Sequence, residues 1–225
     1  MHPEAHSTGL TRNRPIEPAA SVLLIVDVQN YVAAPDGGHY AGMNAEELRS
    51  HDFFFRRLEE IVPRIARLQE CCRRADIEVM YCVIESLTAD GRDRGLDYKI
   101  TGFHVPPGSS DAQVIAPLAP KPDEIVFSKT SSSVFVSTNI DYVLRAMEKR
   151  YLIVTGIATD QCVESAVRDA CDLGYFVTLV TDACGTYSQE RQLASEAAIK
   201  GYCRQVDTSG MVEEIRQLGD KQHDQ

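Results

Sequence analysis

Asp27, Lys129 and Cys162 each stand at or just beyond the end of a short apolar run that predicts a buried β-strand. The carboxyl ends of parallel strands lie along one edge of an open sheet, so the three side chains can converge there. An aspartate can take up a thiol proton, and a lysine can stabilise both the thiolate and the carboxylate. In the loops that follow the predicted strands, histidine is limited to His39 and His104. The grouping therefore predicts covalent catalysis by a cysteine without a histidine base.

Cys162 lies where a loop becomes a helix, inside a stretch that predicts a β-α-β unit, residues 151–183. The β-branched run Tyr151–Thr155 ends at Gly156, the next helix has an apolar stripe, and a second apolar run follows, so the two strands should be parallel. We expect Thr159 or Asp160 to cap the helix. Free N–H groups at a helix start favour a thiolate, and they can hold an oxyanion. A small, buried, inert cysteine is the alternative that position alone leaves open.

The composition fits one soluble α/β domain. The chain has 225 residues, of which 44% are hydrophobic and 25% charged, and its net charge is −10. The acidic balance disfavours binding to nucleic acid or to an anionic membrane, and we find no apolar run long enough to span a bilayer. Seven cysteines without a C-x-x-C spacing predict a reduced, cytoplasmic compartment. We expect a flexible N-terminal arm (residues 1–20), a single domain (21–219) and a polar tail (220–225).

The apolar runs predict six strands, at 21–26, 77–84, 124–128, 151–155, 175–180 and 203–206. Helices are expected over 44–75, 140–150, 163–173, 189–202 and 209–218, with Asn44 and Asn139 as caps and a break near Pro63. The segments 28–38 and 87–110 are expected to be loops. A nucleotide-binding Rossmann domain is excluded, because no G-x-G-x-x-G follows the first strand and no P-loop occurs.

The stretches LLIVDVQN, FSKTSSSVF and VTGIATDQCVESAVRDA, in this order, resemble the isochorismatase-like cysteine hydrolases, and the resemblance spans residues 21–206. It implies a three-layer α/β/α sandwich with a mostly parallel, six-stranded, doubly wound sheet. It also implies roles for the residues: Asp27 as general base, Lys129 as electrostatic partner and Cys162 as nucleophile. The Ile157–Ala158 peptide bond would be cis, and the N–H groups of Ala158 and Cys162 would form the oxyanion hole.

The resemblance further implies a substrate class. Members without the cysteine cleave vinyl ethers, so Cys162 indicates C–N hydrolysis. The pattern GIAT-x-x-CVES-x-x-RD is similar to the ureidoacrylate type, which implies a ureido or carbamoyl substrate such as ureidoacrylate, biuret, triuret or an N-carbamoyl amine. Seven residues are candidates for substrate contact: Asn30, Tyr31, Glu85, Lys99, Phe135, Gln161 and Tyr187.

The sequence leaves alternative functions to weigh, and it also suggests a partner, which is a second copy of the chain. A nicotinamidase-like amide hydrolase is the first alternative, although such members bind a metal through an Asp-x-His segment that is absent here, so we expect no metal and no cofactor. A thiol redox protein, with Cys184 as the resolving cysteine, is less favoured. A non-catalytic binding protein on this fold would lack one of the three site residues. The resemblance implies a homo-oligomer, often a tetramer, and Phe53–Phe55 and the N-terminal arm are the expected contacts.

Overall fold

A sheet of six strands, all parallel, forms the centre of the computed structural model, which describes residues 10–223. The strands are β1 (Ser21–Val26), β2 (Glu78–Ile84), β3 (Ile125–Lys129), β4 (Tyr151–Ile157), β5 (Phe176–Gly185) and β6 (Arg204–Val206). Their order across the sheet is β3-β2-β1-β4-β5-β6. The order starts from β1 and runs outward in both directions, which is the doubly wound arrangement predicted from the sequence.

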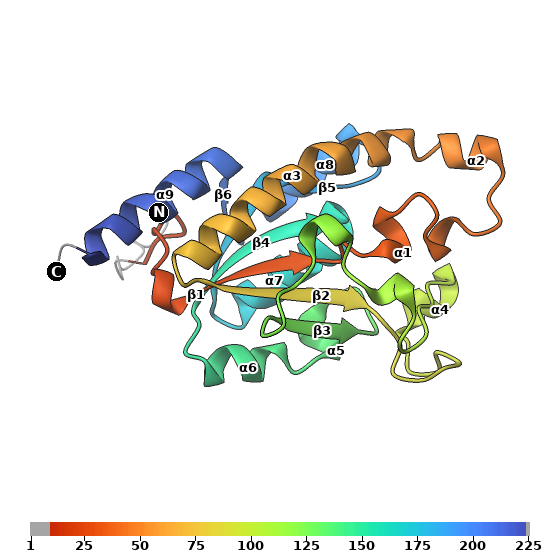
Figure 1. The fold of residues 1–225 in the computed structure, drawn as a ribbon, viewed down its shortest axis with the longest axis horizontal. Helices are drawn as coiled ribbons and strands as arrows, with labels where there is room; N and C mark the ends of the chain where they lie inside the picture. The colour runs from red at the N-terminus through yellow and green to blue at the C-terminus, as the bar shows by residue number, and fades with distance from the viewer. Residues whose placement is uncertain (1–9, 224–225) are drawn as a thin grey trace, which may run out of the picture.

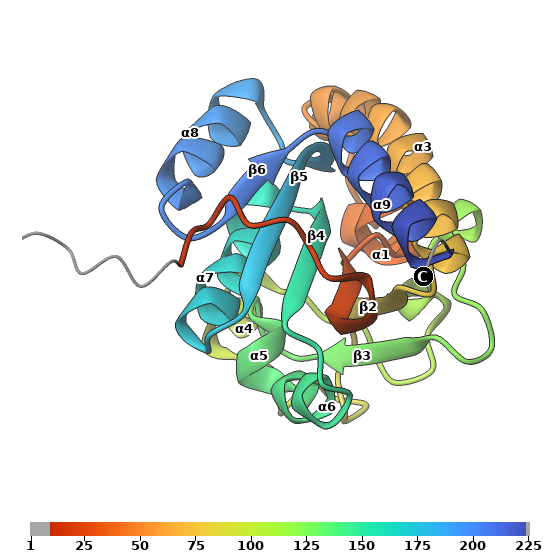
Figure 2. The ribbon, with the colours of Figure 1, turned by 90° about the vertical axis from the view of Figure 1, so that its left-hand side faces the viewer.

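Helices cover both faces of the sheet and make the three layers (Figure 1). On one face, α3 (Asp52–Arg74) and α9 (Thr208–His223) lie side by side (Figure 2). The other face carries α5 (Val134–Ser137), α6 (Ile140–Ala146), α7 (Glu164–Asp172) and α8 (Gln189–Ile199). The predicted α/β/α sandwich is therefore confirmed.

The central strand β1 is apolar from Val22 to Val26 because each side of the sheet has its own hydrophobic core. In β1, Leu23 and Ile25 belong to the core under α3, whereas Val22, Leu24 and Val26 belong to the core under α7. Successive side chains of a strand point to opposite faces, so a strand covered on both sides needs an unbroken apolar run.

The predicted helix 44–75 is two helices, and the predicted break at Pro63 is wrong. Asn44 caps α2 (Ala45–Arg49) through a capping box, and α3 then begins at Asp52. Pro63 lies inside α3, which continues through it. The buried side chains of Ile61 and Ile65 lie on either side of the proline and hold α3 on the sheet, so packing outweighs the lost backbone hydrogen bond.

Two more local predictions differ from the structure. Asn139 makes no capping hydrogen bond; the hydroxyl of Thr138 accepts from the N–H of Ile140 at 3.1 Å instead, and α6 ends at Ala146. The segments expected to be loops contain short helices, α1 (Asn30–Ala33) and α4 (Leu96–Thr101).

The predicted N-terminal arm lies partly outside the described residues, which begin at residue 10. Within the described part, Ile16 is buried, and its N–H donates to Glu214 of α9 at 2.9 Å. At the other end, α9 reaches His223 and so includes residues 220–223, which we expected to belong to the polar tail. Within residues 10–223, no helix combines the length and the apolar character that crossing a membrane requires.

Candidate active site

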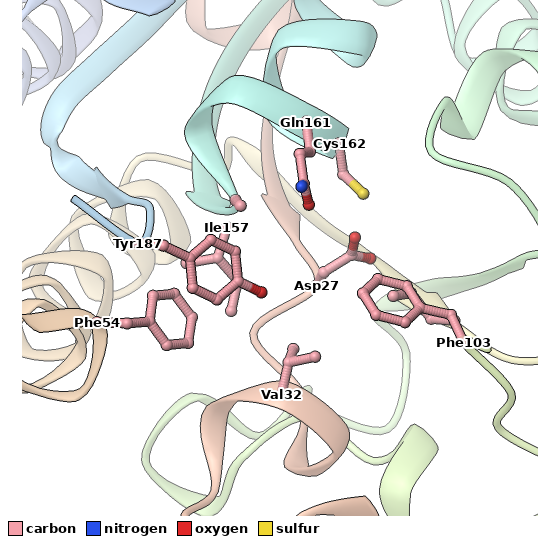
Figure 3. A pocket seen from close by; sticks show the side chains of 10 residues that line it. Asp27, Val32, Phe54, Phe103, Ile157, Gln161, Cys162 and Tyr187 are labelled. Carbon is pink, nitrogen blue, oxygen red and sulfur yellow. The ribbon is translucent and has the colours of Figure 1, made fainter. Parts of the chain in front are cut away.

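Asp27, Lys129 and Cys162 meet at the carboxyl edge of the sheet. Lys129 Nζ lies 2.9 Å from Asp27 Oδ2 and 3.3 Å from Cys162 Sγ. The carboxylate of Asp27 and the sulfur of Cys162 are directed toward the same space (Figure 3). Each residue is positioned by a different strand. Asp27 follows β1, Lys129 is the last residue of β3, and Cys162 lies in the turn after β4. The convergence expected from parallel strand ends is therefore present in the geometry.

Lys129 is the centre of the polar network. Its side chain is 0% exposed, and its ammonium group also donates to the hydroxyl of Tyr98 at 2.7 Å and to the carbonyl of Ser131 at 3.1 Å. Burial acts to lower the pKa of Lys129, but the neighbouring acidic groups, Asp27 above all, outweigh burial and hold this pKa well above its usual value. The lysine therefore remains a cation and fixes the other two side chains around it.

Burial has the largest effect on the pKa values of Asp27 and Cys162. It raises the pKa of the Asp27 carboxyl, although the Lys129 ammonium opposes this. Burial and the neighbouring Asp27 raise the pKa of the Cys162 thiol to about 12. The resting sulfur is therefore a thiol, and a nucleophilic thiolate forms only as its proton is removed. The Asp27 carboxyl, whose pKa is raised, lines the same pocket as this thiol.

The segment after β1 is held by a buried glutamine. Asp27 has a φ of 55°, in the left-handed region, and its N–H donates to the carbonyl of Cys82 in β2 at 2.9 Å. Two residues on, the side chain of Gln29 donates to the carbonyls of Ile84 and Asp111 and accepts from the N–H of Ile84 at 2.5 Å. The second polar residue of the D-x-Q-N pattern thus fixes the chain that presents Asp27.

Cys162 lies in a π-helical turn, Thr159–Val163, that precedes α7. The sequence predicts an ordinary helix start capped by Thr159 or Asp160, and neither caps it. Their side chains are instead bound to other elements. The Thr159 hydroxyl donates to Gln192 of α8 at 2.7 Å, and the Asp160 carboxylate forms an ion pair with Arg191 of α8 at 2.5 Å. The turn is therefore held from outside by α8, and wide turns of this kind are frequent at functional sites.

The backbone before the cysteine has the geometry that the family resemblance implies. The Ile157–Ala158 peptide bond is cis. The carbonyl of Ala158 accepts from the N–H groups of Gln161 and Val163, while its own N–H donates to no described backbone or side-chain group. Gly156 has a φ of 121°, and a Cβ there would lie 2.1 Å from the carbonyl oxygen of Val26, so only glycine allows β4 to approach β1 so closely.

A narrow pocket opens onto Asp27 and Cys162. Its space is about 20 Å³, and its walls are mostly apolar: Val32, Phe54, Ile84, Phe103, Ile157, Ala158 and Tyr187. The rings of Phe54 and Tyr187 stack with their centroids 4.7 Å apart and form one side, opposite Phe103 (Figure 3). Of the seven predicted contact residues, Gln161 and Tyr187 line this pocket.

The other five predicted contact residues do not line it. The amides and carboxylates among them are used within the fold: Asn30 donates to a loop carbonyl, and Glu85 accepts from a backbone N–H and a serine hydroxyl. Lys99 is exposed on the outer side of α4. The hydroxyl of Tyr31 accepts from a backbone N–H at 3.4 Å, and Phe135 packs against a tyrosine ring in the core under α7. The type of a residue alone does not reveal which neighbour its side chain contacts, or whether it faces solvent as Lys99 does.

The sequence interpretation missed four pocket walls and one polar neighbour. Phe54, assigned to a subunit contact, is buried and faces the pocket, and Phe103 follows the unexpected helix α4. Tyr98 of α4 was not among the seven candidates, yet its hydroxyl lies 3.6 Å from Cys162 Sγ and 2.7 Å from Lys129 Nζ. The signal in the sequence is weak, because the apolar residues of α4, Leu96 and Ile100, are exposed.

The remaining cysteines and acidic groups show no second centre. All seven cysteines are free, and Cys184, the expected resolving thiol of a redox protein, is fully buried and does not line the pocket. Burial raises the pKa of its thiol. Among the described residues, no three His, Cys, Asp or Glu side chains gather in a way that could hold a metal ion.

An α/β/α sandwich that brings an aspartate, a lysine and a cysteine together at the carboxyl edge of its sheet defines a class of cysteine-dependent hydrolase. The chain belongs to the isochorismatase family: the model of the isochorismatase domain matches residues 21–210. The resemblance predicted from the sequence is thereby confirmed, and the protein is a hydrolase of this family.

Relatives and solved structures agree with this assignment. The chain is 28% identical over 201 residues to the ureidoacrylate amidohydrolase RutB of Caulobacter segnis, a match that covers 82% of this chain and 80% of the relative. The enzyme of the same name from Caulobacter vibrioides is 29% identical over 187 residues, with 75% and 78% covered. A cysteine hydrolase from Pseudomonas syringae pv. phaseolicola has a TM-score of 0.78 at 25% identity, covering 91% of this chain and 96% of that one. The fold is shared by a pyrazinamidase/nicotinamidase from Streptococcus mutans, which is 22% identical and has a TM-score of 0.67. That match covers 83% of this chain and 99% of the other.

Proposed function

We propose that this protein is a cysteine amidohydrolase that cleaves a C–N bond of a small ureido or carbamoyl compound through a thioester on Cys162. The observation that carries the proposal is the cluster of Asp27, Lys129 and Cys162 around Lys129 Nζ, at distances of 2.9 and 3.3 Å, at the base of a pocket. The similarity to two ureidoacrylate amidohydrolases supports the ureido class of substrate.

The first half of the reaction forms the thioester. Asp27 accepts the Cys162 proton as the sulfur attacks the carbonyl carbon, and the electron pair of the C=O bond moves to oxygen. The N–H groups of Ala158 and Cys162 hold this oxyanion, which is a role open to the Ala158 N–H because it has no acceptor within the described chain. The oxyanion then reforms the C=O bond, the C–N bond breaks, and Asp27 gives its proton to the departing amine.

The second half releases the product. Asp27 takes a proton from water as the water oxygen attacks the thioester carbon, and the same oxyanion forms again. When it collapses, the C–S bond breaks, the acid or carbamate leaves, and the proton on Asp27 returns to Cys162. Lys129 keeps its charge throughout, so it stabilises whichever of its two neighbours is anionic.

The pocket limits the size and polarity of the substrate. About 20 Å³ is room for one water-sized group beside the sulfur, so the reacting carbonyl must be small and unhindered. The flat rings of Phe54, Phe103 and Tyr187 suit a planar ureido or amide group, and the exposed amide of Gln161 can both donate to it and accept from it. The aromatic walls equally suit an aromatic amide, so a nicotinamidase-like activity is the second candidate.

Three finer features belong to the same proposal. The substrate set comprises biuret, triuret, ureidoacrylate and N-carbamoyl amines. The active form is a homo-oligomer, tetrameric by analogy with the family, which light scattering of the purified protein measures directly. The compartment is the reducing cytoplasm, which agrees with the seven free cysteines.

The test is ammonia release from a panel of these compounds and of nicotinamide, with wild type and Cys162→Ser. We expect Cys162→Ser to bind substrate but to lose activity by at least about 10³-fold, because a serine hydroxyl is far less acidic than a thiol and Asp27 removes its proton much less readily. Mass spectrometry of the quenched wild type should show an acyl adduct on Cys162.

The matched control is Cys171→Ser, which removes a thiol from α7 outside the pocket and should retain wild-type activity. Substantial turnover by Cys162→Ser would disprove the thioester mechanism. Activity that depends on cycling between oxidised and reduced protein would favour the thiol redox alternative instead.

A further inference from the structure

Tyr98 is a buried polar residue in direct contact with the catalytic sulfur. Its side chain is 1% exposed, and its hydroxyl lies 2.7 Å from Lys129 Nζ and 3.6 Å from Cys162 Sγ. Tyrosine tends to bury its hydroxyl only where a hydrogen-bond partner is available, and both partners here belong to the proposed catalytic group. The reaction scheme above uses neither the residue nor its proton.

The donor capacities of the two side chains set the direction of these hydrogen bonds. The Lys129 ammonium can only donate, and it donates to the Tyr98 oxygen at 2.7 Å, to the Ser131 carbonyl at 3.1 Å and to Cys162 Sγ at 3.3 Å. The Tyr98 oxygen therefore accepts from Lys129. Either atom of the Tyr98–Cys162 contact can donate while the sulfur is a thiol, but once Cys162 has lost its proton the phenolic O–H is the donor of that pair.

We propose that Tyr98 is a further positioning residue of the site, which accepts from Lys129 and donates its proton to Cys162, so that it stabilises the thiolate. This inference rests on the proposed nucleophilic role of Cys162. No proton is transferred: the O–H bond of Tyr98 stays intact, while the S–H proton goes to Asp27. Hydrogen bonds to an ionised acceptor are stronger than those to a neutral one, so the contact favours the thiolate over the thiol.

The electrostatic surroundings keep the phenol protonated. Burial raises the pKa of Tyr98 well above its usual value, and the negative charges of Cys162 and Asp27 act in the same direction, against Lys129. The titratable groups that face Cys162 come from every neighbouring element: Asp27 after β1, Lys129 in β3, Tyr98 in α4, Cys82 in β2 and Tyr187 after β5.

The fold holds Tyr98 in place by its backbone. The preceding Gly95 donates its N–H to the carbonyl of Thr130 at 2.8 Å, which attaches the start of α4 to the loop after β3. The guanidinium of Arg94 donates to the carbonyls of Gly91 and Phe103 and thereby closes the loop around α4. Phe103, a wall of the pocket, packs on the Tyr98 ring at 5.5 Å. A helix of six residues is therefore fixed with one side chain directed at the sulfur.

The test is the rate of Cys162 alkylation by iodoacetamide from pH 5 to 10 in wild type and Tyr98→Phe, which needs no substrate. Mass spectrometry assigns the alkylated residue. The whole range lies below the Cys162 pKa of about 12, so loss of one hydrogen bond to the thiolate should slow alkylation about tenfold at every pH in it. The matched control is Tyr175→Phe, which removes a buried hydroxyl bound to Asp141 at the opposite edge of the sheet and should leave the profile unchanged.

Superimposable profiles for wild type and Tyr98→Phe would overturn the inference. If Tyr98→Phe does not fold, as thermal unfolding would reveal, site-specific replacement of Tyr98 by 3-fluorotyrosine gives the opposite test. The more acidic phenol is a stronger donor, so alkylation should be faster than in wild type, and an unchanged rate again overturns the inference. If Tyr98→Phe slows alkylation as expected but the wild-type protein hydrolyses no amide, the proposed function is rejected and the role of Tyr98 stands.

Discussion

Replacement of Asp27 by asparagine separates its two roles, as a base and as the anion beside Lys129. The side chain keeps its shape but loses both its charge and its proton affinity. Loss of a general base lowers kcat/KM by about 10²–10⁴-fold, or about 3–5 kcal/mol at 1.36 kcal/mol for each factor of ten. Because Asp27 is needed in both halves of the reaction, we expect the upper part of this range. The assay is ammonia release with the best substrate of the panel.

The same substitution leaves the Lys129 ammonium buried without an anion. Breaking a buried ion pair from one side costs about 3–5 kcal/mol. Lys129 keeps the oxygens of Tyr98 and Ser131 as acceptors, so we expect about 3 kcal/mol, which is a fall in Tm of roughly 6–12 °C for a chain of this size. In the control Glu70→Gln, which breaks an exposed pair with Arg74, the loss should stay below about 1 kcal/mol. If Asp27→Asn keeps kcat/KM within tenfold of wild type, Asp27 is not the base and the mechanism is refuted.

Three further outcomes are expected, two for the pH dependence of activity and one for stability. As pH falls through the raised pKa of Asp27, the carboxylate takes up a proton and can no longer act as a base. The value of kcat/KM should therefore fall on the acid side, with a midpoint above pH 3.8. A midpoint at or below pH 3.8 would contradict the effect of burial on this pKa. No loss due to Lys129 should occur below its ordinary value of 10.5, since its pKa is held well above it. Gln29→Met removes three buried hydrogen bonds and leaves the N–H of Ile84 unpaired, which should lower the free energy of unfolding by about 3 kcal/mol in urea titrations, whereas Gln217→Met, on the surface of α9, should have almost no effect.

The parts of the fold that the sequence predicts are those governed by burial on both faces of the sheet. A strand covered on both sides must be apolar at every position, so the runs that became β1 and β4 are visible without any partner. Residues that follow such runs lie at one edge by topology alone, which is why Asp27, Lys129 and Cys162 could be grouped before any contact was known.

The parts that could not be predicted depend on contacts between distant segments. Pro63 should end a helix on local grounds, and only the packing of α3 on the sheet explains its place there. In α4 the apolar Leu96 and Ile100 are exposed while Tyr98 is buried, which inverts the usual pattern. Candidates such as Glu85 and Lys99 were selected by chemical type, but the direction of a loop side chain is set by neighbours that the local sequence does not specify.

The anchoring of the nucleophile turn by α8 has a consequence for how new specificities can evolve. Thr159 and Asp160 are fixed by Gln192 and Arg191, whereas the walls Val32, Phe54 and Phe103 come from α1, α3 and the segment after α4. Two other walls do share support with the site, because Ile84 is bound to Gln29 and Tyr187 packs against Arg191. Substitutions at Val32, Phe54 and Phe103 can therefore accumulate, one segment at a time, without displacing the sulfur. Such modularity lets one catalytic apparatus serve a succession of small amides, with the molecule recognised drifting while the bond broken stays the same.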